Sequence, residues 1–191
     1  MTRRILTALA LSATLLLTAC ESSEERAEAF YMSGMELLEA GDLERAVVSF
    51  RNVFNFDGEH FEARKELADA LIELGNSSEA YSQYLRLAEQ YPDNALVRQK
   101  LTYMALLAQS WEQAERHGRR ALELEPDAEI NPAIQVSLDY RVAALDEDTP
   151  RLDAVAQEAA ALLDADPSDI LSRRIVLAHA VAQDRPGAVI E

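Results

Sequence analysis

The sequence predicts an all-α protein whose helices form antiparallel pairs stacked along the chain. Glycine and proline are sparse, with six of each in 191 residues, whereas alanine and leucine are abundant, and this balance favours helix over strand. The stretch 27–128 divides into three consecutive blocks of 34 residues in one register: 27–60, 61–94 and 95–128. Hydrophobic residues make up 49% of the chain, which is enough for a core distributed between neighbouring helix pairs.

Small and aromatic residues recur at equal spacings in the three blocks. The matching positions are Phe30, Gly34, Leu37, Ala46, Phe50 and Gly58, then Arg64, Ala68, Leu71, Ala80, Tyr84 and Pro92, then Arg98, Thr102, Ala105, Ala114, Gly118 and Pro126. The alanine early in each second helix lets two helix backbones approach closely, so a large residue there should break the pairing. Gly118 stands where the other blocks have an aromatic ring, and we expect the packing there to be looser or filled from elsewhere.

This period and residue pattern are the signature of the tetratricopeptide repeat, and the chain resembles that family over more than half of its length. The resemblance implies a right-handed superhelical solenoid, in which the first helix of each pair lines a concave surface that binds segments of other proteins. The predicted partner-binding groove consists of Tyr31, Met35, Lys65, Asp69, Gln99 and Tyr103. The same surface would include Leu38, Ile72 and Leu106, for which packing between repeats is the alternative interpretation.

Turn and cap residues mark the expected helix ends. Apolar residues at helical spacing stop at Gly75, where a residue with positive φ can close a helix. Asn76 and Ser110 each stand three residues before a Glu or Gln, which is the spacing of a capping box. Asp42 is a plain N-cap candidate at the equivalent place of the first block.

Beyond residue 128 the register slips. Pro126 and Pro167 are 41 residues apart instead of 34, which predicts a degenerate fourth repeat over 129–168 with seven additional residues. Asn131 precedes a proline and fits a helix start with proline at its first position. We place the additional residues at 146–150, between the two helices of this repeat.

The segment 169–191 predicts an incomplete fifth repeat. Its first helix should end near Gln183, and only the beginning of a second helix follows. Solenoids usually end in a capping helix with a polar outer face, and none is visible in this segment. We therefore expect the sequence to be the N-terminal part of a longer repeat protein.

The first 19 residues have the layout of a secretory signal peptide. Two arginines precede an apolar run over 5–17, which is too short to be a convincing membrane-spanning helix, and Leu-Thr-Ala-Cys closes the segment at Cys20. These four residues resemble the lipobox of bacterial lipoproteins, which implies cleavage before Cys20 and attachment of several acyl chains to it. The alternative is an ordinary secretory signal that happens to end in a cysteine.

Residues 20–26 are predicted to be the acylated cysteine and a short polar tether. Six residues reach only about 20 Å, so the repeats would lie close to the membrane. By resemblance to enterobacterial lipoproteins, Glu21 rather than Asp after the cysteine favours transfer to the outer membrane. We therefore expect a lipid-anchored protein of the bacterial cell envelope that faces the periplasm.

The chain is strongly acidic, with 18 Lys and Arg against 34 Asp and Glu and a net charge of −16. Loss of the signal peptide, which holds two arginines and no acid, would leave −18. Such a charge repels phosphate backbones, so nucleic acid is not an expected partner. Most of the carboxylates are expected simply to solvate outward helix faces.

No pattern in the sequence indicates catalysis, a metal or a cofactor. His60, His117 and His179 are far apart and form no metal-binding motif, and a surface or groove histidine is the ordinary interpretation of the first two. There is no nucleophile motif, and the six glycines are isolated, so no phosphate-binding loop is present. We predict that the protein is not an enzyme.

These observations predict a membrane-anchored scaffold that binds another protein of the cell envelope, as part of an assembly or export machine. Two alternatives remain at this stage. The chain is the non-catalytic N-terminal arm of a larger polysaccharide- or peptidoglycan-related envelope protein, or it is a structural spacer whose groove binds nothing.

Overall fold

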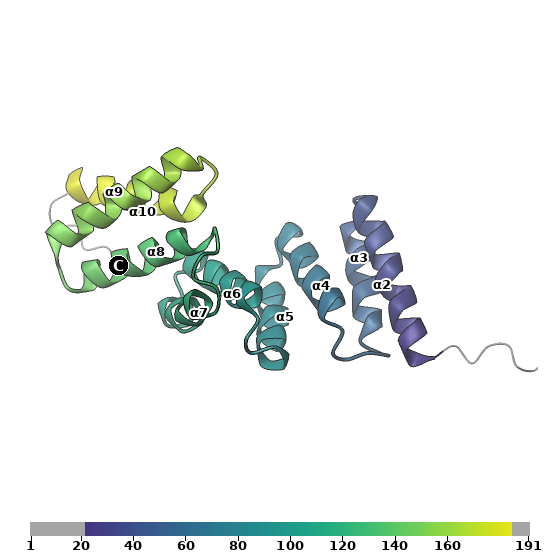
Figure 1. The fold of residues 1–191 in the computed structure, drawn as a ribbon. Coiled ribbons are helices and arrows are strands. Elements are labelled where there is room, and N and C mark those ends of the chain that lie inside the picture. Colours follow the sequence, from purple (N-terminus) through teal and green to yellow (C-terminus); the bar gives the residue numbers. More distant parts are fainter. Residues whose placement is uncertain (1–21, 185–191) are drawn as a thin grey trace, which may run out of the picture. The chain divides into compact units, whose positions relative to one another are not determined.

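The computed structural model describes residues 22–184, which form nine α-helices and no strand (Figure 1). The helices are α2 (Ser23–Glu39), α3 (Leu43–Val53), α4 (Phe61–Glu73), α5 (Ser77–Gln90), α6 (Ala95–Leu107), α7 (Trp111–Leu124), α8 (Asn131–Leu145), α9 (Thr149–Ala165) and α10 (Ile170–Asp184). The predicted all-α helical-repeat fold is confirmed. The predicted signal peptide, Cys20, Glu21 and the segment 185–191 lie outside the described residues.

The described residues divide into two compact units, one that ends at Ala70 and one that begins at Leu71. In the first unit α2 packs against α3. α2 begins with a capping box: the Glu25 amide donates to the Ser22 hydroxyl at 3.0 Å, and the Ser22 amide donates to the Glu25 carboxylate at 2.7 Å. Our expectation of a tether was wrong for residues 23–26, because this box fixes them as the first turn of α2.

The same three-residue turn joins the two helices of every pair. Its middle residue has a positive φ, which is 74° at Gly41, 76° at Gly75, 57° at Gln109 and 54° at Glu147. The next residue donates its amide to the carbonyl five positions earlier, as Asp42 does to Leu37 at 2.9 Å. This is the Schellman arrangement, and the predicted helix end at Gly75 is confirmed.

The predicted N-caps have mixed outcomes. The Arg45 amide donates to the Asp42 carboxylate at 3.3 Å, which confirms this cap. The predicted capping boxes at Asn76 and Ser110 were wrong, since neither side chain accepts a bond from the helix amides. The Asn76 side chain instead donates to the Glu79 carboxylate at 3.0 Å, so both side chains that the box would use are bonded to each other.

In several repeats an arginine near the start of the first helix donates hydrogen bonds to the loop that precedes this helix. The guanidinium of Arg64 donates to the carbonyl of Gly58 at 2.6 Å, and that of Arg98 donates to the carbonyl of Pro92 at 3.0 Å. Arg173 repeats the contact to the carbonyl of Pro167, again six residues earlier. These bonds satisfy loop carbonyls and fix how each new helix begins.

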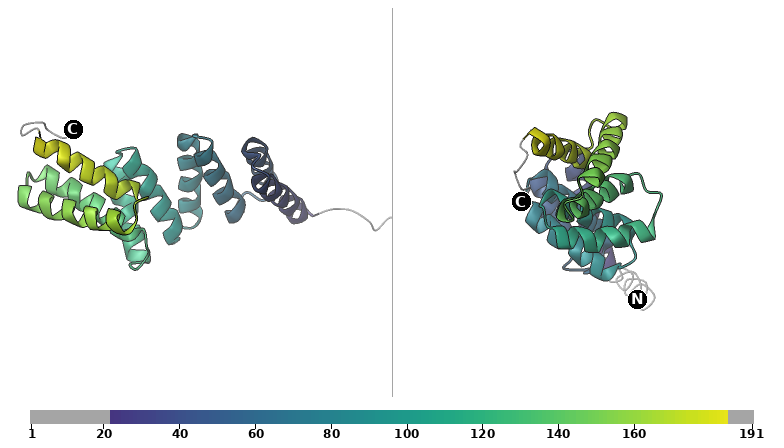
Figure 2. Two further views of the ribbon diagram at one scale, coloured as in Figure 1. Left: turned by 90° about the horizontal axis from the view of Figure 1, so that it is seen from above. Right: turned by 90° about the vertical axis from the view of Figure 1, so that its left-hand side faces the viewer.

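In the second unit α6 packs on α5, α7 and α8, and α8, α9 and α10 pack on one another (Figure 2, green to yellow). Its buried residues include two apolar clusters. The first comprises Ala105, Leu106, Ala114, Ala133, Ile134 and Leu171, and the second comprises Val136, Tyr140, Val155, Ala156, Ala159 and Ile175.

The additional residues of the degenerate repeat do not lie at 146–150, so this prediction was wrong. The turn between α8 and α9 has three residues, like the turn between α6 and α7. The helices themselves are longer, with 15 and 17 residues in α8 and α9 against 13 and 14 in α6 and α7. The segment that enters α8 also has six residues, against four before α6. The Schellman turn has a fixed length, so insertions are accommodated outside it.

Candidate functional site

One face of α6 is not covered by the core of the second unit. The buried face of the helix carries Val97, Leu101, Thr102, Ala105 and Leu106. The other face carries Leu96, Gln99, Lys100, Tyr103 and Leu107, which recur three or four positions apart and so form one stripe. Leu96 is 41% exposed and Leu107 is 37% exposed. We call these five residues the α6 groove.

Two cavities meet along this stripe. The larger one, of about 660 Å³, extends from Lys100, Tyr103 and Leu107 toward the end of α4 and the start of α5. The other, of about 420 Å³, runs from Leu96, Gln99, Lys100 and Tyr103 to Ile130. Lys100 and Tyr103 line both cavities, so the two cavities adjoin each other along α6.

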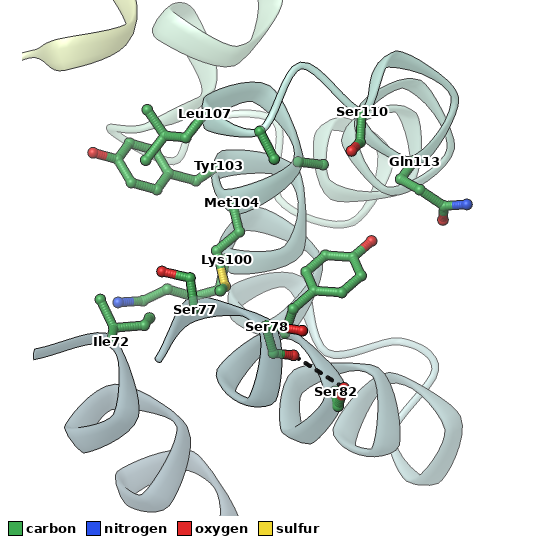
Figure 3. Close-up of a pocket in the computed structure, with 13 residues that line it drawn as sticks. Ile72, Ser77, Ser78, Ser82, Lys100, Tyr103, Met104, Leu107, Ser110 and Gln113 are labelled. Carbon is green, nitrogen blue, oxygen red and sulfur yellow. Dashed lines mark hydrogen bonds between the residues drawn. The ribbon is translucent and has the colours of Figure 1, made fainter. Parts of the chain in front are cut away.

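The walls of the larger cavity differ in chemistry (Figure 3). α6 contributes Tyr103, Met104 and Leu107, which are large and mainly apolar, and Ile72 adds to them from α4. α5 contributes Ser77, Ser78 and Ser82, whose hydroxyls are small and polar, and the Ser82 hydroxyl donates to the Ser78 carbonyl at 3.0 Å. A ligand in this cavity would contact apolar side chains from one helix and hydroxyls from its neighbour.

The predicted groove residues Gln99 and Tyr103 lie together in this groove. Tyr103 is half-buried against the first core cluster, and burial together with the negative charge of Asp169 raises the pKa of its phenol. The Gln99 side chain donates to the Glu125 carboxylate at 3.3 Å. Tyr103 therefore stays neutral at physiological pH and offers an aromatic face with a hydroxyl at its edge.

The other predicted groove residues lie in the first unit, where Tyr31 and Met35 are half-buried on α2. The Tyr31 ring centroid is 5.0 Å from that of His60 and 6.1 Å from that of Phe50. Burial and the charges of nearby glutamates, Glu66 first, raise the pKa of the Tyr31 phenol. Tyr31 therefore already packs against other residues of the first unit.

Lys65 and Asp69 of α4 contact each other. The Lys65 ammonium is 2.9 Å from the Asp69 carboxylate and 2.9 Å from the Glu66 carboxylate. Burial of Lys65 disfavours its charged form, but the hydrogen bonds and charges of the two carboxylates outweigh this and raise its pKa. A ligand anion would compete with two existing partners for this ammonium.

Several sequence-based assignments change in the structure. Leu106 is 3% exposed and packs in the core, and it does not line the α6 groove. Ile72 is 36% exposed and lines the groove, whereas Leu38 is half-buried on α2. His117 is only 4% exposed, so its assignment as a surface or groove histidine was wrong.

The hydrogen-bond partner of the buried His117 is Arg98 of α6. The Arg98 guanidinium lies 3.1 Å from the His117 Nδ1, and an arginine only donates, so Nδ1 accepts and the ring is neutral. Burial and then the charges of Arg98 and Arg116 lower the pKa of His117 to about 4. Its Nε2 is buried without a partner, so this histidine serves packing rather than proton transfer.

Sequence reasoning missed Leu96, Lys100, Leu107 and Ile130. The first three follow from Tyr103 by helical spacing, so the sequence contained a signal for them. Ile130 precedes α8 and reaches the groove only through the packing of α8 on α6.

Among residues 22–184, no group of three or more His, Cys, Asp or Glu side chains is placed to hold a metal ion. Within the same residues, none of the helices is both long and apolar enough to cross a bilayer.

Residues 37–102 match the model of the tetratricopeptide repeat family. A comparison with curated proteins found no match.

Solved structures of helical-repeat proteins resemble this one. A form of MamA (41-end) from Desulfovibrio magneticus RS-1 is 16% identical, with a TM-score of 0.63 over 84% of this chain and 86% of that chain. YrrB, described as a TPR protein with an unusual peptide-binding site, is 15% identical, with a TM-score of 0.57 over 84% of this chain and 79% of that chain. At these identities the likeness establishes the fold.

Proposed function

Because the chain is a tetratricopeptide-repeat protein, we propose that it is a non-catalytic scaffold that binds an apolar peptide segment of a protein partner in the α6 groove. The observation that supports this most directly is the continuous stripe of Leu96, Tyr103 and Leu107 beside two adjoining cavities. YrrB, which has the same fold, is described as having a peptide-binding site.

The composition of the groove suits a peptide better than a small polar ligand. Leucine side chains and an aromatic ring offer apolar area, and Tyr is frequent at interfaces because it combines such area with a hydroxyl. The Ser77, Ser78 and Ser82 hydroxyls supply hydrogen-bonding groups on the opposite wall. A segment with two or three apolar side chains and a polar edge would match both walls.

Site-specific photocrosslinking in cells tests this proposal. A photoreactive phenylalanine at Leu107, in the groove, should give a defined crosslinked product that Tyr103→Ala weakens by about tenfold, as expected for loss of a buried aromatic anchor. The same photoreactive group at Arg119, on the exposed side of α7, is the matched control and should not give this product. A Leu107 product that Tyr103→Ala leaves unchanged would rule out Tyr103 as the anchor, and the absence of any product at Leu107 would favour a structural spacer.

The predicted residues of the first unit are tested in the same experiment. Tyr31→Ala combined with Tyr103→Ala should weaken the product further if α2 also contacts the partner. An effect equal to that of Tyr103→Ala alone would confine the binding site to the second unit.

We further propose that the scaffold is anchored to the bacterial outer membrane through acylation of Cys20, facing the periplasm. This proposal rests on the signal-like residues 1–19 and the Leu-Thr-Ala-Cys ending. Cys20→Ser should move the protein out of the detergent-rich phase after phase separation. If the substituted protein stays in that phase, something other than lipid at Cys20 holds it there.

A further inference from the structure

A separate cavity of about 120 Å³ lies in the second unit, between the end of α6 and the helices α8 and α10. Its polar lining includes Gln109, Tyr140, Arg141 and Arg174, and Trp111 forms an aromatic wall. It shares no lining residue with the two cavities of the α6 groove. Its properties can therefore be tested whether or not that groove binds a partner.

Two guanidinium groups line this cavity, and no acidic residue does. This is unusual in a chain of net charge −16, in which arginines on several helices pair with carboxylates. Such pairs involve Arg45, Arg116, Arg119, Arg120 and Arg151. Within residues 22–184, neither Arg141 nor Arg174 has a carboxylate within ion-pair distance.

The fold holds both guanidinium groups in place by contacts that leave their charge uncompensated. Nη1 of Arg174 donates to the carbonyls of Leu106 and Leu107 at 3.3 and 2.9 Å, at the C-terminal end of α6. The Arg141 guanidinium lies 5.1 Å from the centre of the Trp111 ring, within cation–π range. Neutral carbonyls and an aromatic ring fix the positions of these cations without neutralising them.

Buried polar atoms beside the cavity also lack partners. Tyr140 is 8% exposed, and its hydroxyl makes no hydrogen bond. The Nε of Arg141 is likewise buried without a partner. An unsatisfied buried donor costs about 1–3 kcal/mol, so a bound acceptor would relieve a cost that the fold already carries.

We propose that this cavity binds a carboxylate group of a peptide ligand, held by Arg141 and Arg174 with the Tyr140 hydroxyl as a further donor. A carboxylate is planar and accepts several hydrogen bonds, which matches the fork of donors that a guanidinium presents.

Trp111 gives this proposal a direct readout, because it is the only tryptophan of the chain and contacts Arg141. The full chain in detergent is titrated at constant ionic strength with N-acetyl-alanyl-alanine, while tryptophan emission is recorded. A saturable change is expected with this acid and none with its amide. N-acetyl-glutamate diamide tests a side-chain carboxylate in place of a C-terminal one, and saturation by either acid supports the proposal.

Substitutions connect the response to the cavity. Arg141→Gln should weaken binding at least tenfold, whereas Arg119→Gln, on the exposed side of α7, should leave it unchanged. Should Arg141→Gln fail to fold, Arg141→Lys retains the charge but loses the planar fork, and it should still weaken binding several-fold. Equal responses to acid and amide, equal binding of inorganic phosphate, or unchanged binding by the folded Arg141 variant would overturn the proposal.

Discussion

In the helix pairs α2–α3 and α6–α7 the two helices approach closely at equivalent positions of the repeat. The smaller residue of this contact lies on the first helix in α2–α3 and on the second helix in α6–α7. In α2–α3 the first helix carries Gly34 and the second carries the fully buried Phe50; a Cβ built on Gly34 would lie 2.4 Å from Cε1 of that ring. In α6–α7 the first helix carries Thr102 and the second carries Gly118 at the position of the ring. Each pair therefore has a glycine on one side of this contact, and the helix that carries the glycine differs.

In α6–α7 the next helix, α8, also contributes side chains to this contact. A Cβ on Gly118 would meet Thr102 Cγ2 at 3.1 Å, and also Leu138 Cδ1 at 3.1 Å and Ile134 Cγ2 at 3.5 Å. Leu138 and Ile134 belong to α8. The expectation that this space would be filled from elsewhere is confirmed, and the contact around Gly118 involves three helices, whereas the atoms nearest Gly34 belong to one side chain.

The largest expected effect comes from the contact in α2–α3. Gly34→Ala should lower the free energy of unfolding by about 2–3 kcal/mol, because the new methyl group overlaps a ring that is fully buried and has no space to move. Urea unfolding followed by circular dichroism measures the change.

Two matched variants show whether this loss is due to the ring. Gly34→Ala with Phe50→Leu should be more stable than expected from the two single changes, since the smaller side chain makes room for the methyl group. Gly118→Ala should change stability by less than about 1 kcal/mol, because contacts near 3.1 Å need only small shifts and alanine favours the helix. A loss at Gly118 as large as that at Gly34 would contradict the comparison.

The pair α6–α7 also has a polar contact, between Arg98 and His117, that makes its stability depend on pH. The folded pKa of His117 is lowered to about 4 from a reference value of 6.5. Between these values the unfolded chain binds a proton that the folded chain does not, so the stabilisation is complete above pH 6.5 and is lost as the pH falls toward 4. We expect a loss of about 3 kcal/mol from this group across that window, because one pKa unit corresponds to about 1.4 kcal/mol.

The variant His117→Gln isolates this effect from that of the many carboxylates. Its unfolding free energy, measured by urea titration at a series of pH values, should fall less steeply between pH 6.5 and 4 than that of the parent protein. Identical slopes would mean that His117 is not the titrating group.

The turns of the two pairs differ in backbone strain and give a smaller effect. α2–α3 turns at Gly41, whereas α6–α7 and α8–α9 turn at Gln109 and Glu147, which hold the same positive φ with a side chain. Glu147→Gly should therefore raise the free energy of unfolding by about 1 kcal/mol, and Gly41→Ala should lower it by a similar amount. Thermal unfolding of both variants checks the signs, and destabilisation by Glu147→Gly would show that the left-handed conformation costs little at that turn.

The sequence was informative wherever a property depends on local spacing. The 34-residue period predicted the first three helix pairs, and Gly75 predicted a turn. Properties that depend on packing between repeats were not predictable. Ile130 joins the groove through α8, and Leu106 is buried by helices that follow it in the chain.

The cavity lined by Arg141 and Arg174 also depends on packing between repeats and was not predictable from the sequence. The two arginines are 33 positions apart, close to one repeat length, but the register slip in the fourth repeat prevented their alignment from sequence. Their convergence depends on the longer helices α8 and α9 and on the packing of α8 against α10. A pattern search with a strict 34-residue period misses such a pair.

The smallest expected effect compares the two serine N-caps of α2 and α7. The Ser22 hydroxyl accepts a bond from Glu25 in a complete capping box, whereas the Ser110 hydroxyl caps no amide of α7. Ser22→Ala should destabilise the start of α2 by about 0.5–1 kcal/mol, and Ser110→Ala should not destabilise α7 by loss of a cap. Hydrogen exchange of the first-turn amides, followed by mass spectrometry, should therefore accelerate in α2 and not in α7. Equal acceleration in both helices would mean that the Ser110 hydroxyl also caps its helix in solution, and the contrast between the two helix starts would disappear.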